Sequence, residues 1–83
     1  GKAVEAKPGM IVRAKAGREE GRFMAVTSVK DGFVYLADGK ERKLSAPKKK
    51  NIKHVAFTKA EIQLDNLTDK GLRSFLREYT GNE

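Results

Sequence analysis

The sequence lacks cysteine and tryptophan, and it contains a single histidine, His54, among 83 residues. Without cysteine, disulfides and thiolate metal sites are excluded. A lone histidine has no second histidine or cysteine with which to share an ion, so we expect neither a metal site nor a cofactor. Nothing in the sequence sets His54 beside a nucleophile and a carboxylate, as a catalytic triad requires. We therefore expect a non-enzymatic protein with no catalytic residue and no small-molecule substrate.

Long apolar runs are also missing. No stretch approaches the roughly 18–20 apolar residues that a membrane span needs, and no secretory signal is visible. The absence of cysteine is typical of the cytosol. The sequence therefore predicts a cytoplasmic protein without a membrane partner, and its length suits one small domain.

Positive charge is abundant and unevenly distributed. The net charge is +7 and the pI is about 9.9. Residues 1–59 carry 15 Lys/Arg against 6 Asp/Glu, whereas residues 60–83 carry 3 against 5. A positive field attracts polyanions, of which RNA and DNA are the commonest inside cells. The charge therefore predicts a nucleic-acid partner that binds to the first part of the chain.

Short segments of alternating apolar and polar residues, separated by glycine turns, indicate a mainly β fold. Asp-Gly at Asp31 and Gly32 is a strong hairpin signal. Pro47 is expected to end the fourth strand. Closing short strands into a small barrel would remove their exposed edges. We expect a loose arm at residues 1–8, a barrel at 9–58, and a linker with a helix at 59–83, the strands being 9–16, 22–30, 33–37, 40–45 and 52–57.

The last segment predicts one short helix over residues 69–79. Thr68 is a suitable N-cap, and Leu67 with Leu72 can form a hydrophobic staple. Gly81 is expected just beyond the helix as a C-cap glycine. The helix carries an apolar stripe that either packs on the barrel or binds a partner protein, formed by Leu72, Phe75, Leu76 and Tyr79.

The two faces of the predicted strands differ in composition. Met24 and Val26 share a face, as do Val34 and Leu36, while Phe23 and Tyr35 lie on the opposite faces. Either aromatic residue could stack an unpaired base or belong to the core. In the turn at residues 17–21, the adjacent Glu19 and Glu20 are expected to be solvated.

Basic residues are the best candidates for a binding site. They gather around the first turn, in the predicted fourth strand and in the lysine run, where they can meet phosphate groups. Changing Lys48, Lys49 and Lys50 together to alanine is expected to weaken RNA binding and leave the fold intact. The candidates are Arg13, Lys15, Arg18, Arg22, Lys40, Arg42, Lys43, Lys48, Lys49, Lys50 and Lys53. His54 is predicted in the last strand, either half-buried and hydrogen-bonded or contacting a base or phosphate.

Two stretches resemble a known family. GMIVRAKAGREEGRFMAVTSV resembles a KOW motif, with Gly21 at its most characteristic glycine. DGFVYLADGKERKLSAPKKKNIKHVAFT resembles the large-subunit ribosomal protein family called fourteen-e of archaea and eukaryotes, and its short bacterial relatives. The resemblance covers residues 9–58.

This resemblance implies an SH3-like barrel that binds RNA, chiefly ribosomal RNA, without catalysis. It implies that Gly17 and Gly21 shape the binding turn and that Arg18 and Arg22 meet RNA there. The lysines at 48–50 and Lys53 match the basic segment of the family, and its polar signature is matched by Asn51 and His54. The acidic tail departs from the basic extensions of the ribosomal members, which favours an accessory protein associated with ribosomes or their assembly, with ribosomal proteins as further partners.

Two other functions fit the same sequence. The apolar stripe of the helix favours an adaptor barrel that binds a transcription or translation protein. The charge alone also fits a general DNA-binding barrel.

Overall fold

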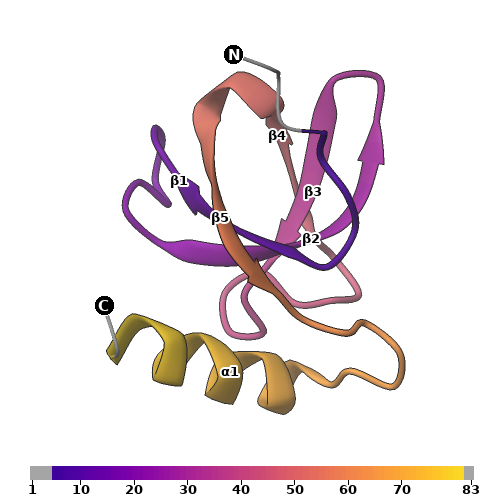
Figure 1. Ribbon diagram of the computed structural model, residues 1–83, viewed down its shortest axis with the longest axis vertical. Helices are drawn as coiled ribbons and strands as arrows, with labels where there is room; N and C mark the ends of the chain where they lie inside the picture. Colours follow the sequence, from indigo (N-terminus) through magenta and orange to yellow (C-terminus); the bar gives the residue numbers. More distant parts are fainter. Residues whose placement is uncertain (1–4, 82–83) are drawn as a thin grey trace.

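The computed structural model describes residues 5–81 as one antiparallel sheet and one helix (Figure 1). The prediction of a mainly β fold with a C-terminal helix is confirmed. The sheet has five strands in the order β4-β3-β2-β1-β5. The elements are β1 (Met10–Ala14), β2 (Phe23–Lys30), β3 (Phe33–Ala37), β4 (Lys48–Asn51), the 3-10 turn η1 (Ile52–His54), β5 (Val55–Glu61) and α1 (Asp69–Gly81).

The sheet is strongly curled. Its two edge strands, β4 and β5, are joined only by the three residues of η1. The edges of a flat five-stranded sheet would lie about 19 Å apart, whereas a 3-10 turn rises only about 2 Å per residue. The sheet must therefore bend until its edges approach at this end, as Figure 1 shows.

Irregular strand pairing helps the sheet to bend. The register between β2 and β3 shifts between Val26 and Ser28, and Thr27 Oγ1 donates a hydrogen bond to the Tyr35 carbonyl there at 3.1 Å. A second shift interrupts the pairing of β1 with β5 between Met10 and Val12. Such bulges bend a strand and increase its twist. At the β2–β3 hairpin, Asp31 (φ 51°) and Gly32 (φ 80°) both adopt positive φ, as the Asp-Gly signal predicts.

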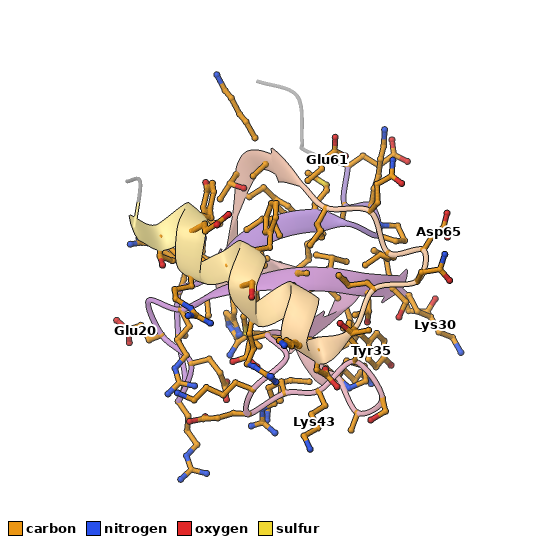
Figure 2. All side chains as sticks on the ribbon, turned by 90° about the horizontal axis from the view of Figure 1, so that it is seen from below. Glu20, Lys30, Tyr35, Lys43, Glu61 and Asp65 are labelled. Atoms are coloured by element: carbon orange, nitrogen blue, oxygen red, sulfur yellow. The ribbon has the colours of Figure 1, made fainter. Side chains whose placement is uncertain are left out.

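Helix α1 lies across one face of the sheet (Figures 1 and 2). Its apolar stripe packs there on Ile11, Ala25 and Ala37, so within this chain the stripe is core. Thr68 Oγ1 accepts a hydrogen bond from the Gly71 N–H at 3.0 Å, which confirms the predicted N-cap. Gly81 was expected beyond the helix and is instead its last residue, a difference within the usual fraying of helix ends.

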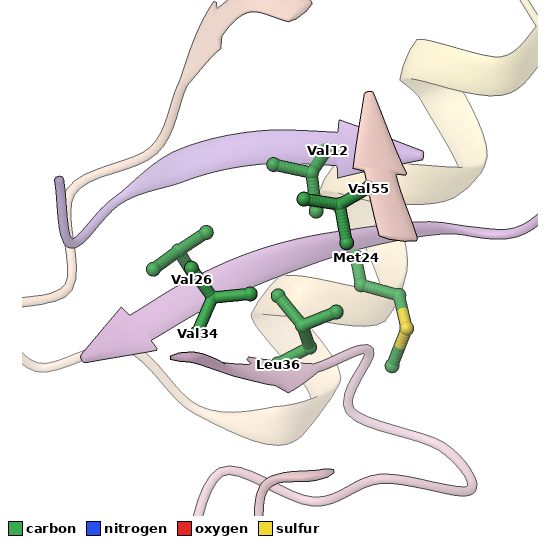
Figure 3. Packing of buried hydrophobic residues seen from close by; sticks show 6 residues of the cluster. All are labelled: Val12, Met24, Val26, Val34, Leu36 and Val55. Atoms are coloured by element: carbon green, nitrogen blue, oxygen red, sulfur yellow. The ribbon is translucent and has the colours of Figure 1, made fainter. Parts of the chain in front are cut away.

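The opposite, concave face of the sheet holds the main core (Figure 3). The predicted aliphatic face is confirmed, because every member of it is fully buried. Ala6, from the segment expected to be a loose arm, packs against this cluster, whereas residues 1–4 of that arm lie outside the described residues. The core consists of Val12, Met24, Val26, Val34, Leu36 and Val55.

The predicted fourth strand at residues 40–45 is wrong. This segment is a loop, and the lysine run that follows it forms β4. The Asp38 carboxylate accepts hydrogen bonds from the backbone N–H groups of Lys40 and Arg42, both at 2.9 Å. An aspartate that bonds its neighbouring backbone in this way favours a turn over a strand. Pro47 accordingly precedes β4 and ends no strand.

The loop at residues 38–47 also fixes the start of the helix. Asp69 Oδ1 accepts the Leu44 N–H at 2.8 Å, and Arg73 Nη1 donates to the Gly39 carbonyl at 2.6 Å. Gly39 is buried with φ 79°, and a Cβ there would clash with the Asp69 carbonyl. Glycine is therefore required at this contact.

No helix among residues 5–81 is long and apolar enough to cross a membrane.

Candidate nucleic-acid interface

A buried carboxylate organises the turn between β1 and β2. Glu19 is only 4% exposed, which corrects the expectation that it is solvated; Glu20 beside it is exposed. Glu19 Oε2 accepts from Arg42 Nη2 at 3.0 Å, and Glu19 Oε1 accepts from Lys50 Nζ at 3.3 Å. Lys50 Nζ also donates to the Ala16 carbonyl at 2.9 Å. The carboxylate thus ties the turn, the 38–47 loop and strand β4 together.

These contacts keep Glu19 ionised. The hydrogen bond from Arg42 lowers the pKa of Glu19 below its ordinary value of 4.5, and Lys50 adds to the effect, although burial opposes it. A buried charge is tolerated when it is paired and hydrogen-bonded, and the Glu19 carboxylate meets this condition because it accepts hydrogen bonds from two cations.

The stability of the protein should consequently depend on pH. Because the pKa of Glu19 is lower in the folded state than its ordinary value, the stabilisation is present above 4.5 and is lost as pH falls through the folded-state pKa. We expect the free energy of unfolding to fall between neutral pH and acid, and to fall less steeply in Glu19→Gln. Urea unfolding of both proteins across this range at about 0.5 M salt, which screens exposed charges, measures the difference. If the free energy of unfolding changed with pH in the same way in both proteins, Glu19 would not be the source of the pH dependence.

The backbone of the turn depends on two glycines with left-handed conformations. Gly17 has φ 84° and Gly21 has φ 87°, as expected for residues that shape the turn. The Gly21 N–H donates to the Ala14 carbonyl at 2.8 Å, which closes the turn onto the end of β1. Arg18, between the two glycines, is exposed. Arg18 is therefore exposed to solvent on a turn whose backbone is held by hydrogen bonds.

A second segment lies directly beside this turn. The Lys15 N–H donates to the His54 carbonyl at 2.8 Å, which joins the end of β1 to η1. His54 was predicted in a strand, but it lies in the 3-10 turn and is exposed. The Asn51 side chain accepts the Lys53 N–H at 2.9 Å and caps this turn, so it has a structural role here. We call the resulting surface the basic end, defined by the exposed residues Arg13, Lys15, Arg18, Lys53 and His54.

Three predicted binding residues form ion pairs within the chain, two with the buried Glu19 and one at the surface. Lys50, with a side chain 9% exposed, and Arg42 both bind Glu19. Arg22 binds Glu41 through two contacts, at 2.7 and 3.3 Å. This pair lowers the pKa of Glu41 and raises that of Arg22. Alanine at all three positions 48–50 would also remove the contacts of Lys50 with Glu19 and the Ala16 carbonyl, so we now expect this change to lower stability as well as RNA binding.

The other candidate lysines lie on strand β4 and on the 38–47 loop. Lys48 is half-buried in the edge strand, and Lys40 and Lys43 are exposed on the 38–47 loop. Lys49 lies over the Phe33 ring, with its Nζ 4.4 Å from the ring centroid. Tyr35 is half-buried and lines a small hollow of about 240 Å³ with these two residues. Figure 2 shows Tyr35 and Lys30 on the opposite side of the molecule from Glu20.

The structure separates the two aromatic candidates for base stacking. Phe23 packs edge-to-face with Tyr79, with ring centroids 5.2 Å apart, and belongs to the core beneath the helix. Tyr35 is not among the residues packed in either core cluster. Tyr35 is therefore accessible from the small hollow, whereas Phe23, which is also half-buried, is accessible only where it lines a groove beside helix α1.

A larger open groove of about 790 Å³ lies between helix α1, the 38–47 loop and the start of β2. It brings together Arg22, Lys40 and two arginines of the helix, Arg73 and Arg77. The helical arginines were missed because the tail is acidic overall. Their i, i+4 spacing was the signal that could have found them, since residues four apart share one face of a helix.

Among residues 5–81, no three His, Asp or Glu side chains gather in a way that could hold a metal ion. Comparison of the sequence with protein-family models found no match, and a search of curated proteins found no significant relative. The resemblance to KOW proteins therefore stays a prediction.

Proposed function

We propose that this chain is a non-enzymatic RNA-binding protein whose basic end contacts structured RNA, with ribosomal RNA as the expected target. The observation that carries the proposal is the arrangement of exposed cations on a rigid support. Arg18 and Lys15 lie on or beside a turn anchored by Glu19, and Lys53 lies on a 3-10 turn bonded to it. Cations held in fixed positions lose less conformational entropy when they bind phosphate.

We further infer that the curled sheet is an SH3-like barrel of the KOW type. Support comes from the strand order β4-β3-β2-β1-β5, the short link between the edge strands and the glycine turn after β1. The association with ribosomes rests on the sequence resemblance, because Gly17, Gly21 and Arg18 lie at the positions that it assigns to RNA binding.

The adaptor alternative has less support. The feature that favoured it, the apolar stripe of the helix, is packed on the sheet of the same chain. A DNA-binding barrel uses the same phosphate contacts, so geometry alone does not separate it from the RNA-binding proposal.

RNA and DNA binding can be compared by fluorescence anisotropy. We expect a structured ribosomal RNA fragment to bind at both low and near-physiological salt, and duplex DNA of equal charge to lose most of its binding at the higher salt. The expected reason is that shape-dependent contacts to A-form RNA survive when general phosphate attraction is screened. Equal loss for both ligands would contradict RNA recognition and leave only general charge attraction.

A further inference from the structure

The groove beside helix α1 combines positive charge with an apolar floor. Three separate segments form it: the start of β2, the 38–47 loop and the part of helix α1 from Arg73 to Thr80. Its volume of about 790 Å³ falls within the range of sites that hold small ligands. Gly21 lines its rim, so the groove begins where the turn that carries Arg18 ends.

The acidic residues of the groove are already engaged. Glu41 accepts both hydrogen bonds of Arg22, and Asp38 Oδ1 accepts two backbone N–H groups. By contrast, Lys40 and Arg77 are exposed and make no ion pair within residues 5–81. These two cations, from opposite walls of the groove, are therefore available to an anionic ligand.

Contacts across the groove hold its walls together. Arg73 donates from the helix to the Gly39 carbonyl at 2.6 Å, which holds one wall against the other. On the floor, Phe23 is fixed by its edge-to-face contact with Tyr79, and Leu76 beside it is buried. A preformed groove orders few side chains on binding, so less of the binding free energy is lost.

We propose that this groove binds an unpaired nucleotide of single-stranded RNA. Lys40 and Arg77 contact its phosphates, and the base lies along the apolar floor beside Phe23. Proteins bind unpaired nucleotides with cations that contact the phosphates and an aromatic surface that contacts the base. An acidic peptide would use only the cations, so the aromatic surface favours a nucleotide. The inference rests on the proposed RNA-binding function and extends it: a single strand leaving a structured RNA at the basic end would continue into the groove.

The test compares two variants of equal charge. Lys40→Ala/Arg77→Ala removes the two free cations, and Lys59→Ala/Lys70→Ala removes two exposed lysines that do not line the groove. Pentauridylate is titrated into the full chain and both variants, with amide shifts followed by NMR. We expect shifts at Phe23 and Thr80 in the wild type. The groove variant should bind about tenfold more weakly, and its salt slope should fall by about 1.4, at about 0.7 per phosphate contact.

Several outcomes would overturn the proposal. If both variants bind pentauridylate equally, the groove makes no phosphate contact. If the wild type binds a structured RNA but pentauridylate shifts no groove amide, the groove proposal fails and the general RNA-binding function stands. If the wild type binds neither RNA, both fail. Pentaglutamate that shifts the same amides at lower concentration than pentauridylate would assign the groove to an acidic peptide instead.

Discussion

Replacing Glu19 by alanine is expected to lower the free energy of unfolding by about 3 kcal/mol. The change leaves Lys50, whose side chain is 9% exposed, without its carboxylate partner and removes the partner of Arg42. A cation stranded in a buried position carries an uncompensated desolvation penalty. A domain of this size has a total stability of about 4–12 kcal/mol, so the loss is a large fraction of it. Equilibrium unfolding in urea measures the change.

Glu20→Ala is the matched control, because Glu20 is the exposed neighbour of Glu19 in the same turn. We expect it to change stability by less than about 0.5 kcal/mol. The double variant Glu19→Ala/Lys50→Met should recover part of the loss, because it removes both buried charges. Equal effects of Glu19→Ala and Glu20→Ala would show that the buried network contributes nothing to stability.

Local patterns were sufficient to predict much of the fold. The alternation of residues along the chain identified the buried face of β2 and β3. The Asp31-Gly32 pair identified the hairpin between them, and Thr68 identified the start of the helix. Each of these features depends on residues only a few positions apart. Their interactions are therefore visible in a short window of sequence.

The errors concern interactions between distant residues. Glu19 is buried because of Arg42 and Lys50, which are 23 and 31 positions away. The 38–47 loop is held partly by Asp69, which takes the Leu44 N–H from 25 positions away. Charge in a turn normally indicates solvent exposure, and no local pattern reveals that a carboxylate has two distant cationic partners.

The candidate site was predicted only in part. Basic residues were identified as a class, but the sequence does not show which of them are engaged in internal ion pairs. Arg42 and Lys50 bind the buried Glu19, and Arg22 pairs with Glu41 at the surface, whereas Arg18 and Lys53 are exposed and form no ion pair within residues 5–81. This division follows from the three-dimensional positions of Glu19 and Glu41. It changes which substitutions test binding and which test stability.

Changing Lys15, Arg18 and Lys53 together to alanine is expected to weaken binding to a structured RNA roughly 100-fold. Each side chain is exposed, and the loss of about 1 kcal/mol per phosphate contact adds up to this factor. The stability of the variant should stay close to that of the wild type, because none of the three side chains holds the Glu19 network. Fluorescence anisotropy measures the affinity, and urea unfolding checks the fold.

The salt dependence of this binding tests the proposed interface most directly. Affinity for the same ribosomal RNA fragment is measured across a salt series for the wild type, for the triple variant and for a control of equal charge, Lys7→Ala/Lys59→Ala/Lys70→Ala. The control removes three exposed lysines outside the basic end. The proposal predicts that the slope of log affinity against log salt becomes shallower by about 2–3 in the triple variant alone. Equal slopes in the two variants would contradict an RNA interface at the basic end.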